Sequence, residues 1–198
     1  RKLKDLIIGA DIFSQGYRPG AMEKLGFGPE ELSEIRPGLI YLSINCYGFD
    51  GEFSDRGGWE QVAQIMTGLT TIENGSNKMN PPSLLPAAAN DYITGYLGAY
   101  GVLLALARRA KEGGSYHVRV SLCQTAMMIY RNGKIQDGLA PEELSLSEIE
   151  DLSILSTTHL GEAKHLAPVL NLSETRPFWK MPTPKLGGNK AEWSETPT

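Results

Sequence analysis

The spacing of apolar residues predicts short buried strands separated by helices. Apolar runs of strand length occupy residues 10–15 and 39–46, and both are bounded by Gly and Pro turn signals. Residues 116–122 alternate between apolar and polar side chains, which predicts a half-buried strand. Helical spacing covers residues 2–9, 20–26, 29–35, 59–69 and 123–136, and the longest predicted helix runs from Asp91 to Gly113.

The order of these elements indicates an α/β fold. Strand, helices and strand in succession form a βαβ unit, so we expect a Rossmann-like, open, mostly parallel sheet flanked by helices, incomplete in its N-terminal part. The pattern changes after Gly138, where one or two acidic helices are followed by a Pro-rich segment. We therefore expect an α/β domain over residues 1–138. Residues 139–198 are expected to form an acidic helical segment and an extended C-terminal tail that packs on the domain or on a partner subunit.

Composition narrows the classes of protein. The 198 residues are 41% hydrophobic and 21% charged, as in a globular domain. The net charge of −4 argues against a nucleic-acid partner, because such proteins carry an excess of Lys and Arg. No apolar run is long enough to cross a membrane and no signal peptide is recognisable, so a cytoplasmic location is expected. Cys46 and Cys123 are expected to be reduced thiols in the core.

Asp91 is the first candidate for chemistry, because it follows three alanines and an asparagine at a predicted helix start. One interpretation is a helix N-cap, whose carboxylate accepts bonds from free backbone N–H groups. The other interpretation uses the same physics, since those N–H groups would keep the carboxylate ionised and able to act as a nucleophile. Spacing alone does not separate the two.

Three other features carry weaker signals. Glu60 follows Gly57 and Gly58 at a helix start, where a carboxylate complements the helix dipole and the glycines allow a ligand near the backbone. Tyr17, Arg18 and Lys24 lie in a strand-to-helix turn, which suits a phosphate-and-adenine ligand or is a solvated basic turn. The three histidines lack metal-ligand spacing, so no metal site is predicted.

The motifs agree, in order, with one family over roughly residues 5–130. The segment Ala10-Asp11-Ile12 through Tyr17-Arg18-Pro19-Gly20 to Lys24-Leu25-Gly26 resembles the ENFRPG region of CoA-transferase family III, which includes the CaiB/BaiF-type transferases. The resemblance continues through Arg36-Pro37-Gly38, Arg56-Gly57-Gly58, Asp91 and the strand from Tyr116 to Leu122. The chain is similar to the C-terminal half, or a fragment, of such proteins.

This resemblance implies acyl-CoA transfer between carboxylic acids. In the family an Asp at the position of Asp91 attacks an acyl-CoA thioester and forms an anhydride and then an aspartyl-CoA thioester. Glu60 matches a carboxylate beside the reacting centre, and Gly57 and Gly58 are candidate oxyanion donors. The implied CoA contacts are Tyr17, Lys24, Leu25 and Arg56, and Arg18, Gly57 and Gly58 are further candidates for binding CoA. An acyl-CoA and an acid acceptor would be the substrates, no tightly bound cofactor is expected, and an interlocked homodimer is implied.

Departures from the family pattern keep alternatives open. Gln15 and Gly16 replace an acidic residue and an asparagine, and the family's first strand and helix have no counterpart here. Trp59 stands where the α-methylacyl-CoA racemase branch has a histidine base, which argues against racemisation. A non-catalytic CoA-binding or dimerisation half of a two-copy protein is the alternative to an enzyme.

Overall fold

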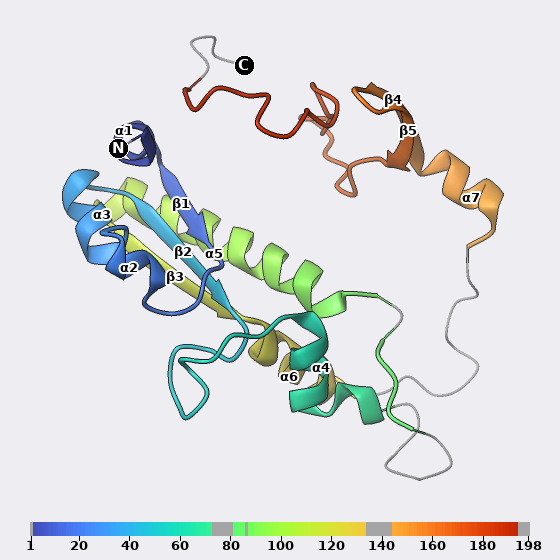
Figure 1. The fold of residues 1–198 in the computed structure, drawn as a ribbon, viewed down its shortest axis with the longest axis horizontal. Coiled ribbons are helices and arrows are strands. Elements are labelled where there is room, and N and C mark those ends of the chain that lie inside the picture. Colours follow the sequence, from blue (N-terminus) through green and yellow to red (C-terminus); the bar gives the residue numbers. More distant parts are fainter. Residues whose placement is uncertain (1, 73–80, 86, 134–143, 194–198) are drawn as a thin grey trace. The chain divides into compact units, whose positions relative to one another are not determined.

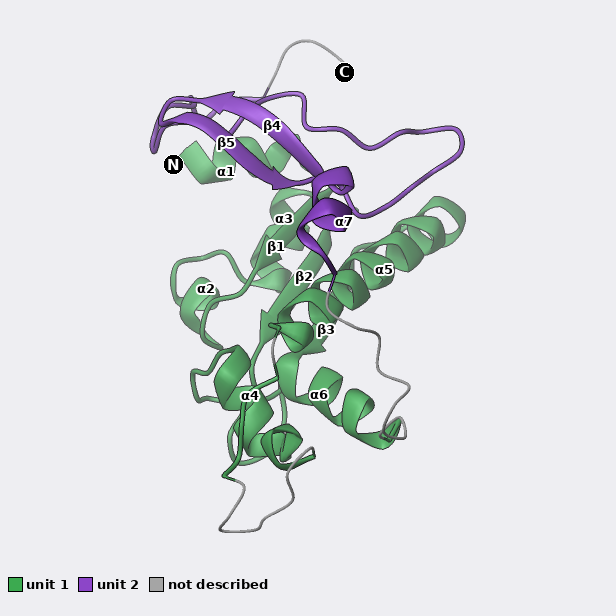
Figure 2. Cartoon of the chain, turned by 90° about the vertical axis from the view of Figure 1, so that its right-hand side faces the viewer, with its two compact units in different colours: residues 1–134 green, residues 135–198 purple. Residues whose placement is uncertain are grey.

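The computed structural model describes residues 2–72, 81–85, 87–133 and 144–193, in two compact units, residues 1–134 and 135–198 (Figure 2). The first unit contains α1 (Lys2–Ile8), β1 (Ile12–Gln15), α2 (Ala21–Lys24), α3 (Pro29–Ile35), β2 (Ile40–Asn45), α4 (Glu60–Thr67), the 3-10 helix η1 (Leu69–Thr71), α5 (Ala89–Glu112), β3 (Tyr116–Ser121) and α6 (Leu122–Arg131). The second contains α7 (Leu146–Asp151), β4 (Ser153–Thr158) and β5 (Gly161–Leu166).

A parallel sheet organises the first unit. Its strand order is β1-β2-β3, with Ile40 of β2 opposite both Ile12 of β1 and Tyr116 of β3. β2 is the central strand and its first four residues are buried, which explains why it reads as a continuous apolar run. The predicted α/β fold with a parallel sheet flanked by helices is confirmed.

Helices cover both faces of this sheet (Figure 1). On one face α5 packs Val102 and Ala105 against Ile40 and Leu42, and the apolar residues of β3 join this cluster. On the other face α1 and α3 supply Ile7 and Leu32, which pack around Tyr41 of β2. Because successive residues of a strand point to opposite faces, β2 contributes to both clusters.

Two glycines set the distance between α5 and the sheet. A Cβ atom at Gly101 would lie 2.7 Å from Val118 Cγ1, and one at Gly98 would lie 3.3 Å from Leu42 Cδ2. Larger residues at these positions would therefore push the helix away from β2 and β3. This close packing outweighs the cost of about 1 kcal/mol that a glycine carries inside a helix.

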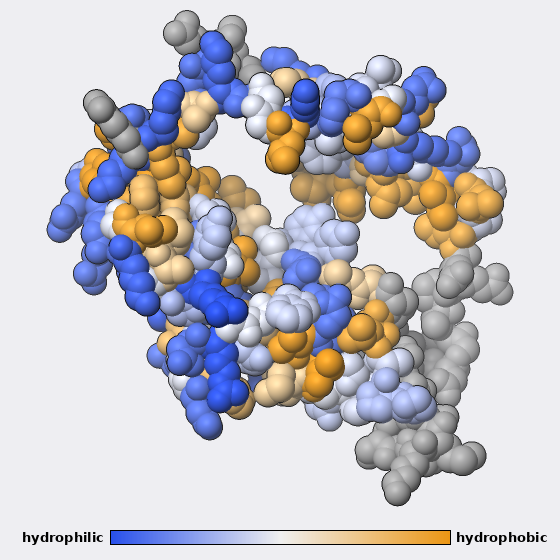
Figure 3. Space-filling model, viewed as in Figure 1, coloured by the Kyte–Doolittle hydropathy of each residue, from blue (hydrophilic) through white to orange (hydrophobic). Residues whose placement is uncertain are grey.

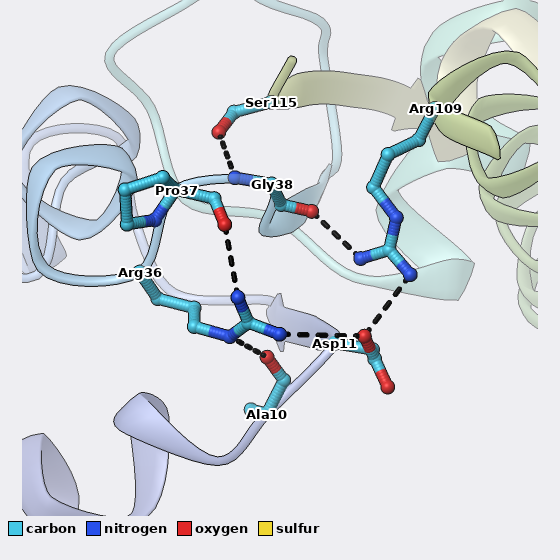
Figure 4. Close-up of polar contacts among 7 residues, drawn as sticks. All are labelled: Ala10, Asp11, Arg36, Pro37, Gly38, Arg109 and Ser115. Atoms are coloured by element: carbon cyan, nitrogen blue, oxygen red, sulfur yellow. Dashed lines mark hydrogen bonds and ion pairs between the residues drawn. The ribbon is translucent and has the colours of Figure 1, made fainter. Parts of the chain in front are cut away.

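A polar cluster around Asp11 joins the three strands at their amino-terminal ends (Figure 4). Asp11 lies 3.0 Å from the Arg109 guanidinium of α5 and 3.8 Å from that of Arg36. Arg109 also donates to the Gly38 carbonyl at 2.7 Å, and the Gly38 N–H donates to Ser115 Oγ at 2.9 Å. The cluster thus connects the start of all three strands to the last turns of α5.

The second unit is a helix followed by an antiparallel hairpin. Ser145 and Glu148 form a capping box that begins α7, where an acidic helix was predicted. β4 pairs with β5 from Ser153–Leu166 to Thr158–Gly161, which forms an antiparallel hairpin that the sequence analysis did not predict. Residues 167–193 contain no helix or strand. Apolar side chains remain on the surface around α7 and the hairpin (Figure 3).

The described helices include none that is both long and apolar enough to pass through a bilayer.

Replacing Arg109 by Met should destabilise the first unit, because the Gly38 carbonyl and the Asp11 carboxylate lose a charged donor. We expect a loss of about 1–2 kcal/mol in the free energy of unfolding, measured by urea denaturation. Arg108→Met is the matched control, since Arg108 lies on the exposed face of the same helix, where it pairs with Glu112 and lies over the Tyr116 ring, and should cost less than about 0.5 kcal/mol. Equal losses for the two variants would contradict a structural role for the Asp11 cluster.

Candidate active site

The candidate nucleophile lies at the beginning of α5. The helix starts at Ala89, two residues earlier than predicted, so Asp91 is its third residue and not its cap. The N-cap residue, Ala88, has no side chain that can accept a hydrogen bond. Asp91 is exposed, whereas its neighbour Asn90 is completely buried.

Glu60 takes the place of the missing cap from another helix. Its carboxylate accepts hydrogen bonds from the backbone N–H of Asn90, at 3.2 Å to Oε1, and of Asp91, at 3.1 Å to Oε2. Gln64 Nε2, one turn along α4, donates to Oε1 at 2.8 Å, and Gln64 Oε1 accepts from the Leu85 N–H at 2.8 Å. Because Glu60 is only 3% exposed, these bonds fix the beginning of α5 to α4 inside the protein.

This arrangement corrects the expectation that the helix N–H groups hold the Asp91 carboxylate. Those donors bond to Glu60, and the Asp91 carboxylate forms no hydrogen bond or ion pair within the described residues. Partial burial and, after it, the nearby negative charge of Glu60 raise the pKa of Asp91 above its usual range. The side chain is therefore an exposed, unpartnered carboxylate of increased basicity.

The predicted glycine pair passes close to the end of β2. A Cβ atom at Gly58 would lie 2.5 Å from Cys46 Sγ and 3.2 Å from Tyr47 Cε2, so any larger residue would displace this segment. At Gly57 a Cβ atom would lie 2.7 Å from Arg18 Nε. The Arg18 guanidinium therefore lies against the Gly57 backbone and joins two segments that the sequence analysis had linked only by resemblance.

The remaining predicted CoA contacts lie on exposed turns. Tyr17 is 66% exposed, and its backbone N–H donates to Gln15 Oε1 at 2.8 Å. Lys24 ends α2, and Leu25, which follows it, is 67% exposed. Arg56 lies with its guanidinium 4.4 Å from the centre of the Phe53 ring. The structure thus brings Glu60 to Asp91 and Arg18 to Gly57, and it leaves Tyr17, Lys24 and Leu25 with side chains open to solvent.

Neither cysteine is suited to act as a nucleophile. Both are free in the structure, and Cys46 is buried as predicted, whereas Cys123 is only half-buried. Burial, and next the neighbouring Cys123, raises the pKa of Cys46 to about 12, and burial also raises the pKa of Cys123. Thiols with raised pKa values stay protonated near neutral pH and react slowly.

Sequence reasoning missed a cavity of about 420 Å³ at the carboxyl ends of β2 and β3. Its lining includes Tyr47 and Phe49 after β2, Arg119 and Ser121 of β3, and Thr125 of α6. Thr125 accepts a hydrogen bond at 2.7 Å from Thr94 of α5, which lies three residues after Asp91. The alternation of β3 could have indicated this site, since it places Arg119 on the side away from the apolar residues that face α5.

Sequence comparison finds similar proteins that are named as CoA-transferases. The chain is 42% identical over 127 residues to the acetyl-coenzyme A transferase nodX of Hypoxylon pulicicidum, covering 62% of the chain and 21% of the relative. It is 35% identical over 125 residues to the succinyl-CoA–L-malate CoA-transferase beta subunit of Chloroflexus aurantiacus, covering 63% of the chain and 31% of the relative. The chain therefore spans less than a third of the length of either protein.

Fold comparison leads to the same group. A crystal structure of Rv3272 from Mycobacterium tuberculosis matches 66% of the chain and 36% of its own length, with a TM-score of 0.61 and 31% identity. The sequence model of CoA-transferase family III matches residues 1–150, which include the whole parallel sheet and the segments around Asp91 and Glu60. The chain belongs to CoA-transferase family III.

Proposed function

We propose that the protein transfers CoA between carboxylic acids and that Asp91 is its nucleophile. The observation that carries this proposal is an exposed carboxylate without a partner, fixed on a helix whose end is capped internally by Glu60. An aspartate that served only as a cap would use its oxygens on backbone N–H groups, and these donors are already satisfied. Relatives that transfer CoA or acyl groups support the assignment.

The reaction needs four successive nucleophilic substitutions, each at a carbonyl carbon. The Asp91 carboxylate attacks the thioester carbon, the C–S bond breaks, and a mixed anhydride and CoA thiolate form. The thiolate attacks the Asp91 carbonyl, which releases the donor acid and gives an aspartyl-CoA thioester. The acceptor carboxylate then attacks this thioester and expels the thiolate, and thiolate attack on the new anhydride yields the product acyl-CoA and free Asp91.

The raised pKa of Asp91 assists the first step. A more basic carboxylate is a better nucleophile once it is ionised, and burial together with Glu60 increases its basicity. Glu60 is therefore assigned as a positioning residue, because its oxygens contact the α5 backbone and fix the direction of Asp91. Backbone N–H groups at Gly57 and Gly58 are the proposed donors for the developing oxyanion.

The CoA moiety is assigned to the turn between β1 and α2. Arg18 and Lys24 supply positive charge for its phosphates, and Tyr17 presents an exposed ring for the adenine. Leu25 and Arg56 are assigned to the same ligand as apolar and cationic contacts. We further propose a cytoplasmic homodimer as the working form.

The pH dependence of stability should reveal the state of Asp91. Its pKa is raised in the folded protein, so ionisation of Asp91 costs stability, and this cost is absent below the unfolded pKa and fully present above the folded pKa. Asp91→Asn should therefore gain stability relative to the wild type as the pH rises through the acid range, measured by urea unfolding between about pH 3 and pH 7. The opposite trend would indicate an ordinary helix-capping carboxylate with a lowered pKa.

Chemical trapping tests the nucleophile directly. The full-length protein incubated with an acyl-CoA and hydroxylamine should acquire a hydroxamate on Asp91, detected by peptide mass spectrometry. Asp91→Asn should lower the transfer rate by about 10³-fold or more and abolish the modification. Asp55→Asn is the matched control, because Asp55 is an exposed carboxylate on the loop before Gly57 and should keep both.

The same experiment separates the enzyme from a non-catalytic half. Transferase activity without modification at Asp91 would reject Asp91 as the nucleophile. CoA binding without transfer or modification would show that this chain is the non-catalytic CoA-binding half.

A further inference from the structure

The cavity at the carboxyl ends of β2 and β3 has the character of an anion-binding site. Most of its lining is apolar or uncharged and includes Leu97, Val120 and Met128 as well as Ser121 and Gln124. Arg119 supplies its positive charge. The other charged residue of the lining is Asp50, which like Arg119 is exposed, and the two form no ion pair within the described part of the chain.

The Arg119 guanidinium is oriented by a chain of side-chain contacts. It lies 5.2 Å from the centre of the Phe49 ring, and the Phe49 ring meets the His117 ring edge-on at 6.4 Å. His117 Nε2 is 2.9 Å from Ser43 Oγ, which is buried and also accepts a bond from Gln15 Nε2 at 3.2 Å. Stacking on an aromatic ring leaves the edge N–H groups of a guanidinium free to bind a carboxylate.

The neighbourhood of Arg119 also keeps its charge uncompensated. Burial first, and then the positive charge of Arg119, lowers the pKa of His117, so this imidazole is neutral near pH 7 and adds no second cation. No salt bridge joins Arg119 to a carboxylate in the described residues. A ligand carboxylate would therefore supply the anion that the protein itself does not.

Two residues of the cavity lining also contact segments next to the proposed reacting centre. Tyr47 lines the cavity, and its ring is also the neighbour of Gly58 in the glycine loop. Thr125 lines it and bonds to Thr94, three residues after Asp91. Along α5, Asp91 and the lining residue Leu97 are six residues apart, which corresponds to roughly 9 Å of helix axis.

We propose that this cavity binds the second carboxylate of a dicarboxylic acid substrate and that Arg119 is its specificity-determining residue. The inference rests on the proposed function, because the first carboxylate of the acid is the one that reacts at Asp91. A short carbon chain between the two groups would lie along the apolar residues Leu97, Val120 and Met128. Charge and lining thus favour a dicarboxylate over a monocarboxylate of equal length.

The test uses the full-length protein with a series of unbranched dicarboxylates and with monocarboxylates of the same chain lengths. Arg119→Gln should weaken dicarboxylate binding, measured by calorimetry, and raise the KM for the acid by about 10- to 100-fold, as expected for loss of a charged hydrogen bond. Monocarboxylate kinetics should not change. Arg108→Gln is the matched control, because Arg108 also stacks on an aromatic ring, that of Tyr116, outside the cavity and should leave both ligands unaffected.

Two results would overturn the subsite: equal effects of the two arginine variants, or no dicarboxylate binding by the wild type. The measurement with Asp91→Asn keeps the two proposals apart. If this variant binds dicarboxylate normally and transfers no CoA, both proposals hold. If it still transfers CoA, the nucleophile assignment fails, whereas Arg119-dependent binding would still support the cavity as a dicarboxylate site.

Discussion

The buried carboxylate of Glu60 is the interaction on which the candidate site depends. A helix begins with N–H groups that have no partner inside the helix, and α5 begins at alanines that cannot supply one. Glu60 provides both acceptors from the first turn of α4, and Gln64 holds Glu60 in place. The same contact fixes α4 and α5 to each other. The Asp91 side chain, which follows Asn90 on α5, is therefore not needed to cap the helix.

Placing Glu60 there has an electrostatic consequence for Asp91. A buried anion beside a second carboxylate disfavours ionisation of that second group, and partial desolvation acts in the same direction. The positive end of α5, which ordinarily would stabilise the Asp91 charge, is instead directed at Glu60. The structure therefore gives its two neighbouring carboxylates different environments, because Glu60 is buried and hydrogen-bonded whereas Asp91 is exposed and has no partner among the described residues.

Close backbone packing complements this electrostatic arrangement. Gly58 brings the loop before α4 against Cys46 and Tyr47 at the end of β2, while Gly101 brings α5 against β3. The Gly58 contact lies at the carboxyl end of β2, on the side of the sheet where ligands of open α/β sheets commonly bind. The cavity that contains Arg119 lies at the same edge, next to the glycine loop.

The sequence by itself determined the α/β class, the parallel order of strands and helices, and Asp91 as the residue to examine. The first two follow from local rules, since apolar periodicity specifies strands and helices and Gly and Pro mark their ends, whereas the choice of Asp91 as a nucleophile rested on the family resemblance. The predicted helix start at Asp91 was two residues late, because the residue that caps α5 lies on α4 and not in the local sequence. The hairpin of β4 and β5 was also missed, because its short strands are exposed and lack a clear apolar alternation.

Only the tertiary structure decided the protonation tendency of Asp91, the role of Glu60 and the existence of the Arg119 cavity. Each depends on residues far apart in the chain: Glu60 is 31 positions from Asp91, and Ser43 is 74 positions from His117. A pKa responds to charge and burial in space, and neither is visible in the spacing of residues along a chain. Sequence patterns could identify candidate side chains for the site, and only the folded structure determined which of them lie close together.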